Sequence, residues 1–413
     1  MKVLHYSEYI SIDGDKAFSR NITGYGYMVV DIASYVAKEG IDVDLLTFSG
    51  ITDAKKYKNV NILKKMWKDI ILSINYKDLL IGIVNTFKTI PKSDQKRMIM
   101  SYIMFGLFQK VINQNRYDII HFHGISPAND ILMQYCLKND IKFVVTLHGL
   151  NAFSKSIKIF TYQANVEKNF LKKAYLKKIP ISIISQGIKK EIMRHLQVEK
   201  VDNFQVISNG CMIEEQFTLK VNIYNKYNIK QNRKVALCVG NFSKNKNQLQ
   251  VVKAYKDLSK KEKNRFVILF IGSPNEDSRV KKFIEEFGLE DELILCGSVL
   301  KDEMSSYFAQ ADFTVLASIS EGFGLSIIEG FVYGLPNLTF KDLDAVDDIY
   351  DEKVMITLKD REDDTLSHGM IDMLEKRWNA DYIKNHAKRF SLDKMAIKYI
   401  EFYKKNVEIK NHL

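Results

Sequence analysis

The sequence has no run of about 18 consecutive apolar residues, the length that a membrane-spanning helix needs. Its start, from Met1 to Tyr6, has no long apolar segment and no small-residue cleavage pattern, and it looks like a buried strand, so we expect no secretory signal. Internal repeats and low-complexity tracts are also missing. We therefore expect a folded protein of the cytoplasm.

Cysteine is scarce, with four residues and no Cys-x-x-Cys pair. This usage argues against a disulfide framework or a cysteine-rich zinc site and is typical of a reducing compartment. Two of the four lie in or beside apolar runs, where a free thiol packs as a small apolar group. The four are Cys136, Cys211, Cys238 and Cys296.

What the sequence does contain is a regular alternation of short apolar runs, rich in β-branched residues, with longer helical patterns. Such runs are typical of parallel sheets that helices cover on both faces. A length of 413 residues is too long for one ordinary core. We therefore predict an α/β protein with two doubly wound, Rossmann-like domains facing across a cleft. The runs are 3–6, 43–48, 119–123, 143–147 and 181–184 in the first domain, and 235–239, 266–271, 293–296, 313–317 and 337–340 in the second.

The domain boundary is expected where a polar segment rich in Asn and Lys, 225–234, precedes a fresh strand. This gives a first domain over 1–216 and a second over 217–395. The last part of the chain, 396–413, belongs to an amphipathic helix. Ligands of open α/β sheets bind at the carboxyl ends of the strands, so the loops there are the candidate site.

The most informative segment is 318–330, Ser-Ile-Ser-Glu-Gly-Phe-Gly-Leu-Ser-Ile-Ile-Glu-Gly, which follows an apolar strand. Gly322 and Gly324 let the backbone approach a ligand closely, and amides at the following helix start point toward hydroxyl or phosphate oxygens. Glu321 and Glu329 are roughly 12 Å apart at ~1.5 Å per residue. This is too far for the paired carboxylates of a glycoside hydrolase, but it suits two ends of one long ligand.

This segment and the following Gly334-Leu335-Pro336 turn resemble the Glu-x7-Glu element of the retaining glycosyltransferases of family 4, which have the GT-B fold. The resemblance implies that Glu321 contacts donor-sugar hydroxyls and that Glu329 binds the ribose. It also implies that the C-terminal helix crosses back to the first domain. It covers residues 1 to about 405 and is strong over 235–340. The loop residues that would bind the sugar and diphosphate are Gly322, Phe323, Gly324 and Leu325.

A second donor-binding loop follows the first strand of the second domain. The family usually has Gly-Arg here with a Lys five residues further on, and both cations hold the diphosphate. Gly240 and Lys246 match that pattern, but Asn241 stands in the place of the arginine. Asparagine can donate a hydrogen bond but brings no charge, so Lys244 is a candidate replacement.

In the first domain, Gly24 and Gly26 precede a helix expected over 27–38 and resemble the family's N-terminal glycine loop, although a plain turn also fits. Thr-Leu-His-Gly at 146–149 matches a family histidine, which implies that His148 faces the donor sugar and the acceptor. A neutral imidazole there would donate to a sugar hydroxyl. His123 is a candidate for the cleft lining.

His121 and His123 project to one face of a strand, which can indicate metal ligands. No adjacent Cys or acid completes the set, and the resembling family uses no metal, so we expect no metal and no other cofactor.

The resemblance implies a metal-independent hexosyltransferase that acts with retention, with His148, Glu321 and Lys246 as catalytic residues. The donor would be a UDP- or GDP-sugar and the acceptor a glycan or a lipid-linked molecule of cell-surface polysaccharide or glycoconjugate synthesis. Two alternatives stay open. One is a sugar-nucleotide epimerase of the same fold, which needs no acceptor; the other is a catalytically silent partner subunit, for which Asn241 is the only hint.

The region 54–110 is longer than the resemblance accounts for. Eleven Lys or Arg face three Asp between Lys55 and Arg97, and apolar residues from Ile62 to Ile74 recur at helical spacing. This predicts a basic amphipathic helix that is either simply solvated or docked on the anionic inner face of the membrane. An anionic acceptor also fits the charge. Nucleic acid is not expected, because aromatic stacking platforms are not arranged for it.

Overall fold

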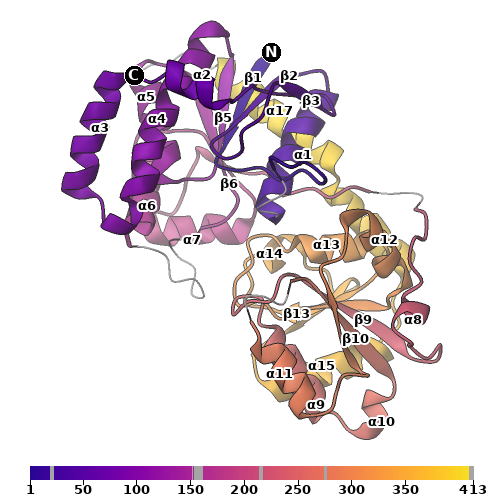
Figure 1. The fold of residues 1–413 in the computed structure, drawn as a ribbon. Helices are drawn as coiled ribbons and strands as arrows, with labels where there is room; N and C mark the ends of the chain where they lie inside the picture. The colour runs from indigo at the N-terminus through magenta and orange to yellow at the C-terminus, as the bar shows by residue number, and fades with distance from the viewer. Residues whose placement is uncertain (19–22, 151, 153–160, 214–216, 274–276, 409–413) are drawn as a thin grey trace.

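The computed structural model describes residues 1–18, 23–150, 152, 161–213, 217–273 and 277–408. They form two α/β domains, each built on a twisted sheet (Figure 1). The strand order is β3-β4-β2-β1-β5-β6-β7-β8 in the first sheet and β11-β10-β9-β12-β13-β14 in the second. All pairs are parallel except β3–β4. The prediction of two doubly wound domains is confirmed.

All five apolar runs predicted in the first domain form strands. The strands are β1 (Lys2–Ser7), β2 (Asp42–Thr47), β3 (Lys55–Tyr57), β4 (Val60–Ile62), β5 (Ile119–His123), β6 (Phe143–Leu147), β7 (Ile181–Ile183) and β8 (Phe204–Val206). The helices are α1 (Gly24–Lys38), α2 (Trp67–Leu72), α3 (Tyr76–Thr89), α4 (Lys92–Gln114), α5 (Pro127–Lys138), α6 (Thr161–Leu176) and α7 (Gln186–Leu196).

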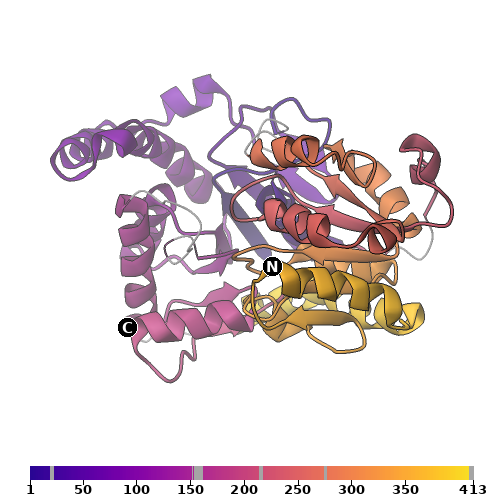
Figure 2. The same ribbon diagram turned by 90° about the horizontal axis from the view of Figure 1, so that it is seen from below.

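The five predicted runs of the second domain are strands as well. Its strands are β9 (Lys234–Val239), β10 (Phe266–Ile271), β11 (Leu293–Gly297), β12 (Phe313–Leu316), β13 (Asn337–Phe340) and β14 (Met355–Leu358). The helices are α8 (Ile223–Lys226), α9 (Gln248–Asp257), α10 (Lys260–Lys263), α11 (Arg279–Glu286), α12 (Lys301–Gln310), α13 (Leu325–Val332), α14 (Val346–Ile349), α15 (Asp363–Glu375), α16 (Ala380–Ala387), η2 (Lys388–Phe390) and α17 (Leu392–Glu408). Helices α9 and α15 lie side by side (Figures 1 and 2) and share one core with α11.

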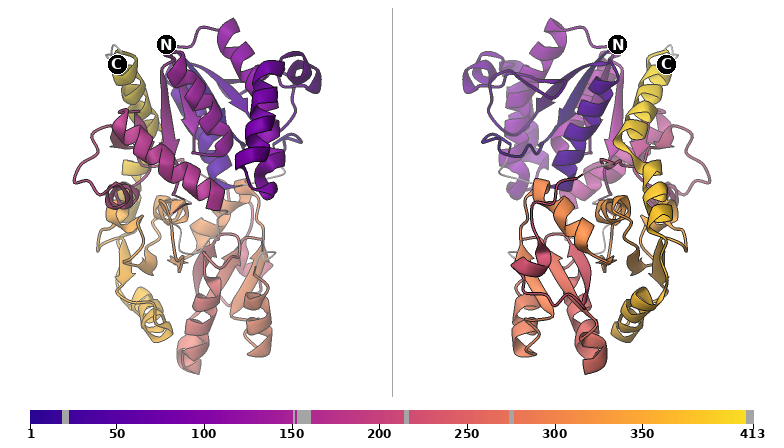
Figure 3. Two further views of the ribbon diagram at one scale, coloured as in Figure 1. Left: turned by 90° about the vertical axis from the view of Figure 1, so that its left-hand side faces the viewer. Right: turned by 90° about the vertical axis from the view of Figure 1, so that its right-hand side faces the viewer.

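The last helix joins the two domains. Helix α17 leaves the second domain and runs along the first, beside α1 (Figure 3). Its residues Met395, Tyr399 and Tyr403 belong to the core of the first domain. Gly210, in the connection between the domains, permits the close approach, since a Cβ there would lie 2.8 Å from the Cα of Leu392. The return expected over 396–413 thus begins earlier, at Leu392, and residues 409–413 lie outside the described part.

A second contact between the domains lies at α7 and α14. The backbone N–H of Gln186 donates to Asp348 over 2.7 Å, and the Lys190 ammonium lies 2.8 Å from Asp347. Apolar packing continues across the boundary, because Ile188 of the first domain and Phe323 of the second belong to one buried cluster. The loops at the facing sheet edges are therefore held in contact.

The single helical pattern predicted from Ile62 to Ile74 is wrong. Ile62 is in β4, which pairs with β2, and the helix α2 spans only Trp67–Leu72. Val60 and Ile62 alternate inward and are 1% and 2% exposed. Over so few residues a strand period and a helix period look alike, and the pairing with β2 decides between them. The rest of region 54–110 is divided among β3, α3 and α4.

Candidate active site between the two domains

The loops after β9 and β12 are tied together by one asparagine. The Asn245 carbonyl accepts from Ile319 N–H over 2.7 Å, and the side chain of Asn245 bonds both the N–H and the carbonyl of Ser320 over 3.2 and 3.0 Å. Sequence reasoning missed Asn245, because its role depends on a partner 75 residues away. The tie brings the loop that carries Lys246 against the loop that carries Glu321.

Lys246 and Glu321 form an ion pair in this position. The Nζ atom lies 2.6 Å from Oε2 of Glu321, and the two side chains are 27% and 18% exposed. Ser318 Oγ donates to the same carboxylate oxygen over 3.3 Å. A partly buried charge pair of this kind can hold two oppositely charged or polar parts of one ligand. The structure thus places these two motif residues side by side.

Gly322, the residue after Glu321, meets the first domain. A Cβ on Gly322 would lie 3.3 Å from the backbone oxygen of His148 and 3.3 Å from Cδ1 of Ile184. Two loops that are far apart in the sequence and belong to different domains thus touch at this glycine. The backbone of His148 therefore lies beside the loop that carries Glu321.

The start of α13 supplies free amides to the same place. Gly324 is its N-cap and has φ 74 and ψ 50, a left-handed conformation that favours glycine. Phe323 is only 2% exposed and packs edge-on against Phe390, so its ring is structural. Leu325 opens the helix, where the first N–H groups have no partner within the helix.

Glu329 lies one to two turns into α13. Burial raises the pKa of its carboxyl group to about 7, while Lys301 and Lys246 lower it and Asp31 raises it further. The carboxylate makes no hydrogen bond or ion pair with another residue in the described part of the chain. It is thus a half-buried acid whose charged neighbours include Lys301 and Lys246.

Lys301 is a site residue that the sequence motifs do not indicate. It begins α12, after β11, and its Nζ lies 4.6 Å from the ring centroid of Tyr27 in α1. This cation–π contact bridges the two domains. Its place at the carboxyl end of a strand was the only signal available in the sequence.

Gly240 and Asn241 shape the loop before Lys246. Gly240 has φ 145, and a Cβ there would touch the aliphatic stem of Lys246 at 3.4 Å. The Asn241 side chain accepts from Ser273 N–H over 2.9 Å, so it ties this loop to the loop after β10. Lys244 is exposed, and its charge adds to the Arg279 hydrogen bond that lowers the pKa of Asp277. Whether Lys244 replaces the missing arginine stays a prediction.

The glycine loop of the first domain begins α1, three residues earlier than expected. Thr23 caps the helix by accepting from Gly26 N–H over 3.1 Å, and Gly24 is exposed with open space around it. Gly26 is packed on Ser11, whose Oγ would lie 2.2 Å from an added Cβ. Gly26 is therefore needed for the close contact with Ser11.

Tyr25, between these glycines, was not singled out by the sequence analysis. Its hydroxyl donates to the His123 carbonyl over 2.9 Å and lies 2.8 Å from Ser7 Oγ. Its ring meets the ring of His148 edge-on, at 4.9 Å between centroids. Tyr25 therefore helps to fix the orientation of His148.

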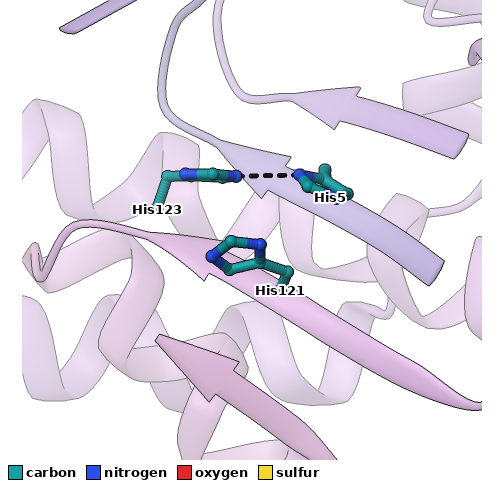
Figure 4. A group of neighbouring side chains, drawn as sticks. All are labelled: His5, His121 and His123. Atoms are coloured by element: carbon teal, nitrogen blue, oxygen red, sulfur yellow. Dashed lines mark hydrogen bonds between the residues drawn. The ribbon is translucent and has the colours of Figure 1, made fainter. Parts of the chain in front are cut away.

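His123 does not line a cleft, contrary to the prediction. It is fully buried, because β5 is a central strand, and its Nδ1 lies 3.0 Å from Nε2 of His148. Its Nε2 lies 3.0 Å from Nδ1 of His5 (Figure 4). Burial lowers the pKa values of His5 and His148 to about 3 and holds those of His121 and His123 well below the usual range, so these imidazoles are neutral.

The three histidines His5, His121 and His123 offer one ring nitrogen each within 4.8 Å of one another, which makes them the candidate metal ligands of the described residues (Figure 4). The third ligand, His5, could not be recognised from the sequence, because it comes from β1, which the parallel register sets opposite His121. Both ring nitrogens of His121 already have hydroxyl partners, Tyr403 and Thr146, each at 2.6 Å. This arrangement fits hydrogen-bonded neutral imidazoles.

Two facing Rossmann-like domains with a cation, two carboxylates and a helix N-terminus at their junction are typical of the GT-B fold. Comparison with known families agrees: the model described as "Glycosyl transferases group 1" matches residues 220–390, and the model described as "Glycosyltransferase Family 4" matches residues 22–215. The two models lie on the two domains and together span most of the chain. The chain belongs to the family 4 glycosyltransferases.

Individual relatives are distant. An uncharacterised glycosyltransferase of Methanocaldococcus jannaschii is 21% identical, over 94% of this chain and 96% of the relative. The GDP-mannose:cellobiosyl-diphosphopolyprenol alpha-mannosyltransferase of Xanthomonas oryzae is 24% identical, over 53% of this chain and 54% of the relative. The solved structure of sucrose-phosphate synthase from Thermosynechococcus elongatus superposes with a TM-score of 0.76 and 15% identity over 98% of this chain and 99% of that one. The structural likeness shows the shared fold.

Proposed function

We propose that this glycosyltransferase moves a hexose from a UDP- or GDP-sugar to a glycan or lipid-linked acceptor, with retention and without a metal ion. Its products would belong to cell-surface polysaccharide or glycoconjugate synthesis. The observation that carries the proposal is the junction of Lys246, Glu321 and Gly322 with His148 across the two domains. The acceptor in the name of the Xanthomonas relative, a diphosphopolyprenol-linked sugar, supports a lipid-linked acceptor for this chain as well.

In this proposal the protein acts by positioning and by electrostatic stabilisation. Lys246 and the first amides of α13 stabilise the negative charge that grows on the departing diphosphate. Glu321 accepts hydrogen bonds from sugar hydroxyls, and Glu329 does the same for the ribose. The acceptor attacks from the face that the diphosphate leaves, and the diphosphate helps to take the acceptor's proton.

A transfer assay tests the reaction type directly. Nucleotide release from a UDP- or GDP-sugar should depend on added acceptor. The proton NMR spectrum of the product should show the same anomeric configuration as the donor. EDTA should leave the rate unchanged, since the cationic groups do the work of a divalent ion. Product formed without acceptor would indicate an epimerase, and a strict need for Mg²⁺ or Mn²⁺ would contradict metal-independent transfer.

The pKa of Glu329 predicts a pH-dependent donor affinity. The ionised carboxylate accepts hydrogen bonds from both ribose hydroxyls, and a folded-state pKa of about 7 means that this form is lost as the pH falls through 7. The KM for the donor should therefore rise about tenfold between pH 8 and pH 6. Glu329→Gln should have a raised KM that changes little with pH. Parallel pH profiles for the two proteins would show that Glu329 does not bind the donor.

Helices α2 and α3 carry the exposed apolar surface that a membrane contact needs. Eight of the eighteen large hydrophobic residues that are exposed in the described part of the chain lie between 67 and 87. In Figure 1, α3 stands at the outer side of α4. The eight are Trp67, Ile71, Leu72, Tyr76, Leu80, Ile81, Val84 and Phe87.

Lysines flank this surface, although not all those counted in the sequence take part. Lys64, Lys68, Lys77 and Lys88 are exposed, whereas Lys65 is 2% exposed and donates to the Thr47 carbonyl over 2.9 Å. Apolar side chains between lysines match the anionic headgroups and acyl boundary of a bilayer. No helix in the described ranges is both long and apolar enough to cross a membrane. We propose a peripheral contact with the inner leaflet.

Vesicle flotation tests this contact. The protein should float with vesicles that contain anionic lipid and not with neutral ones, and Leu80→Glu with Phe87→Glu should abolish flotation, because two buried charges cost more than the contact gains. Phe287→Glu, at a 42% exposed site in the second domain, is the matched control and should float normally. Equal flotation of all variants, or flotation without a preference for anionic lipid, would contradict the membrane contact. The exposed faces of α2 and α3 would then simply be solvated.

A further inference from the structure

Three histidines form a hydrogen-bonded line from the active site into the core. His148 Nε2 lies 3.0 Å from Nδ1 of His123, and His123 Nε2 lies 3.0 Å from Nδ1 of His5. His5 Nε2 in turn lies 3.4 Å from the hydroxyl of Tyr403. In all three histidines Nε2 therefore faces the core end of the line. In His123 and His5, Nδ1 faces the active-site end.

The line continues beyond Tyr403, which lies on α17. Its hydroxyl is 2.6 Å from Nδ1 of His121, and His121 Nε2 is 2.6 Å from the Thr146 hydroxyl. His5, His121 and Tyr403 are fully buried, so these contacts do not compete with bulk solvent. Among the described residues, Tyr403 is the group that joins the two halves of this line.

The proton positions along the line depend on one another. A neutral imidazole has one N–H and one bare nitrogen, and at each contact one atom must donate and the other accept. If His148 donates from Nε2, then His123 and His5 must also carry their protons on Nε2, and the Tyr403 hydroxyl accepts from His5 and donates to His121. The reverse order places every imidazole proton on Nδ1. The Nε2–H form is the more stable tautomer of a free neutral histidine, which favours the first order.

The other nitrogen of His148 is at the end of the line. Nδ1 of His148 is buried and has no hydrogen-bond partner in the described part of the chain. A buried nitrogen without a hydrogen-bond partner is costly, so a ligand hydroxyl that reaches this atom would be stabilising. The direction of the whole line decides whether this atom offers a proton or a lone pair.

We propose that Tyr403 is a positioning residue for sugar transfer. Through His5 and His123, its hydroxyl holds His148 in the Nε2–H tautomer. Nδ1 of His148 then accepts a hydrogen bond from a hydroxyl of the bound sugar. This rests on the proposed function for the identity of the ligand. It assigns His148 an acceptor role in place of the donor role expected from the sequence. It also gives a task to a residue of the C-terminal helix, which no motif indicates.

Histidine ring nitrogens report the tautomer directly. In protein labelled with ¹⁵N only in its histidine rings, and assigned with the His148→Gln variant, the His148 signals should show a bare Nδ1 and a protonated Nε2. Tyr403→Phe removes the joining hydroxyl, so the two His148 signals should move toward the average of both tautomers. Tyr399→Phe is the matched control: Tyr399 is equally buried one turn earlier on α17, and its hydroxyl lies 3.3 Å from Thr146, outside the path from Tyr403 to His148. Its His148 signals should not move.

Kinetics add a second readout. Tyr403→Phe should lower kcat about tenfold and leave the donor KM nearly unchanged, whereas Tyr399→Phe should affect neither. His148 protonated on Nδ1 in the unaltered protein, or unchanged signals in Tyr403→Phe, would overturn the proposal whether or not transfer is found. One equivalent of zinc in the purified protein, bound by His5, His121 and His123, would overturn it too. The expected tautomer without any transfer activity would support the relay and count against the proposed function alone.

Discussion

Lys246→Ala should lower kcat about 100-fold while the protein stays folded. Lys246 is the only residue of the family's usual pair of diphosphate-binding cations in this chain, because Asn241 is neutral and its side chain accepts from Ser273. The loss should fall on kcat more than on donor KM, since the charge to be stabilised is greatest as the diphosphate leaves. Steady-state kinetics with a saturating acceptor measures both.

Lys244→Ala is the matched control, because this exposed lysine lies in the same loop two residues away. If Lys244 replaces the missing arginine, its removal should cost activity as well, and the double variant should be nearly inactive. A circular dichroism spectrum and a melting temperature equal to those of the parent protein would show that each variant is folded. A normal kcat in Lys246→Ala would remove Lys246 from the site.

Gly322→Val should reduce kcat/KM by about 100-fold. A Cβ at this position already lies 3.3 Å from the His148 carbonyl oxygen, and the two methyl groups of valine reach further, so the two loops must separate. Displacement of reacting groups by about 1 Å is enough for such a loss. Gly322→Ala, which needs a shift of only a few tenths of an ångström, should keep most of the activity.

The comparison of the two variants separates geometry from stability. Both should unfold at temperatures close to that of the parent, because Gly322 itself is only half-buried and lies at the contact between the domains. Equal activity of Gly322→Val and the parent would mean that His148 and Glu321 do not act at one site. Equal loss in both variants would point to a backbone effect of removing the glycine.

The strands were predictable because parallel strands that are buried on both faces leave near-continuous apolar runs. The unpredicted strands β3, β4, β8 and β14 have three or four residues, and β3 and β8 are partly exposed edges of the first sheet. The prediction of a helix from Ile62 was wrong because the pairing of β4 with β2 outweighs a short periodic pattern in the sequence. Local sequence thus indicates strands best where the apolar run is long.

The site was predictable to the extent that its residues belong to one loop or follow a strand. Lys246 and Glu321 each follow an apolar strand, so the sequence places both at the carboxyl ends of strands, where the structure brings them into contact. Asn245, Tyr25, Lys301 and His5 were missed, since each acts on a partner that only strand register or the contact between domains brings near. The burial of His123 was missed because strand alternation does not say which strand is central.

A crystal structure with bound donor nucleotide tests the central claim most directly. A thermal-shift screen of UDP, GDP and ADP would choose the nucleotide, since a ligand that binds the folded state raises its stability. The account predicts a diphosphate on Lys246 Nζ and the first amides of α13, with the ribose on Glu329. A nucleotide bound away from these groups, or with Lys246 still paired only to Glu321, would contradict it.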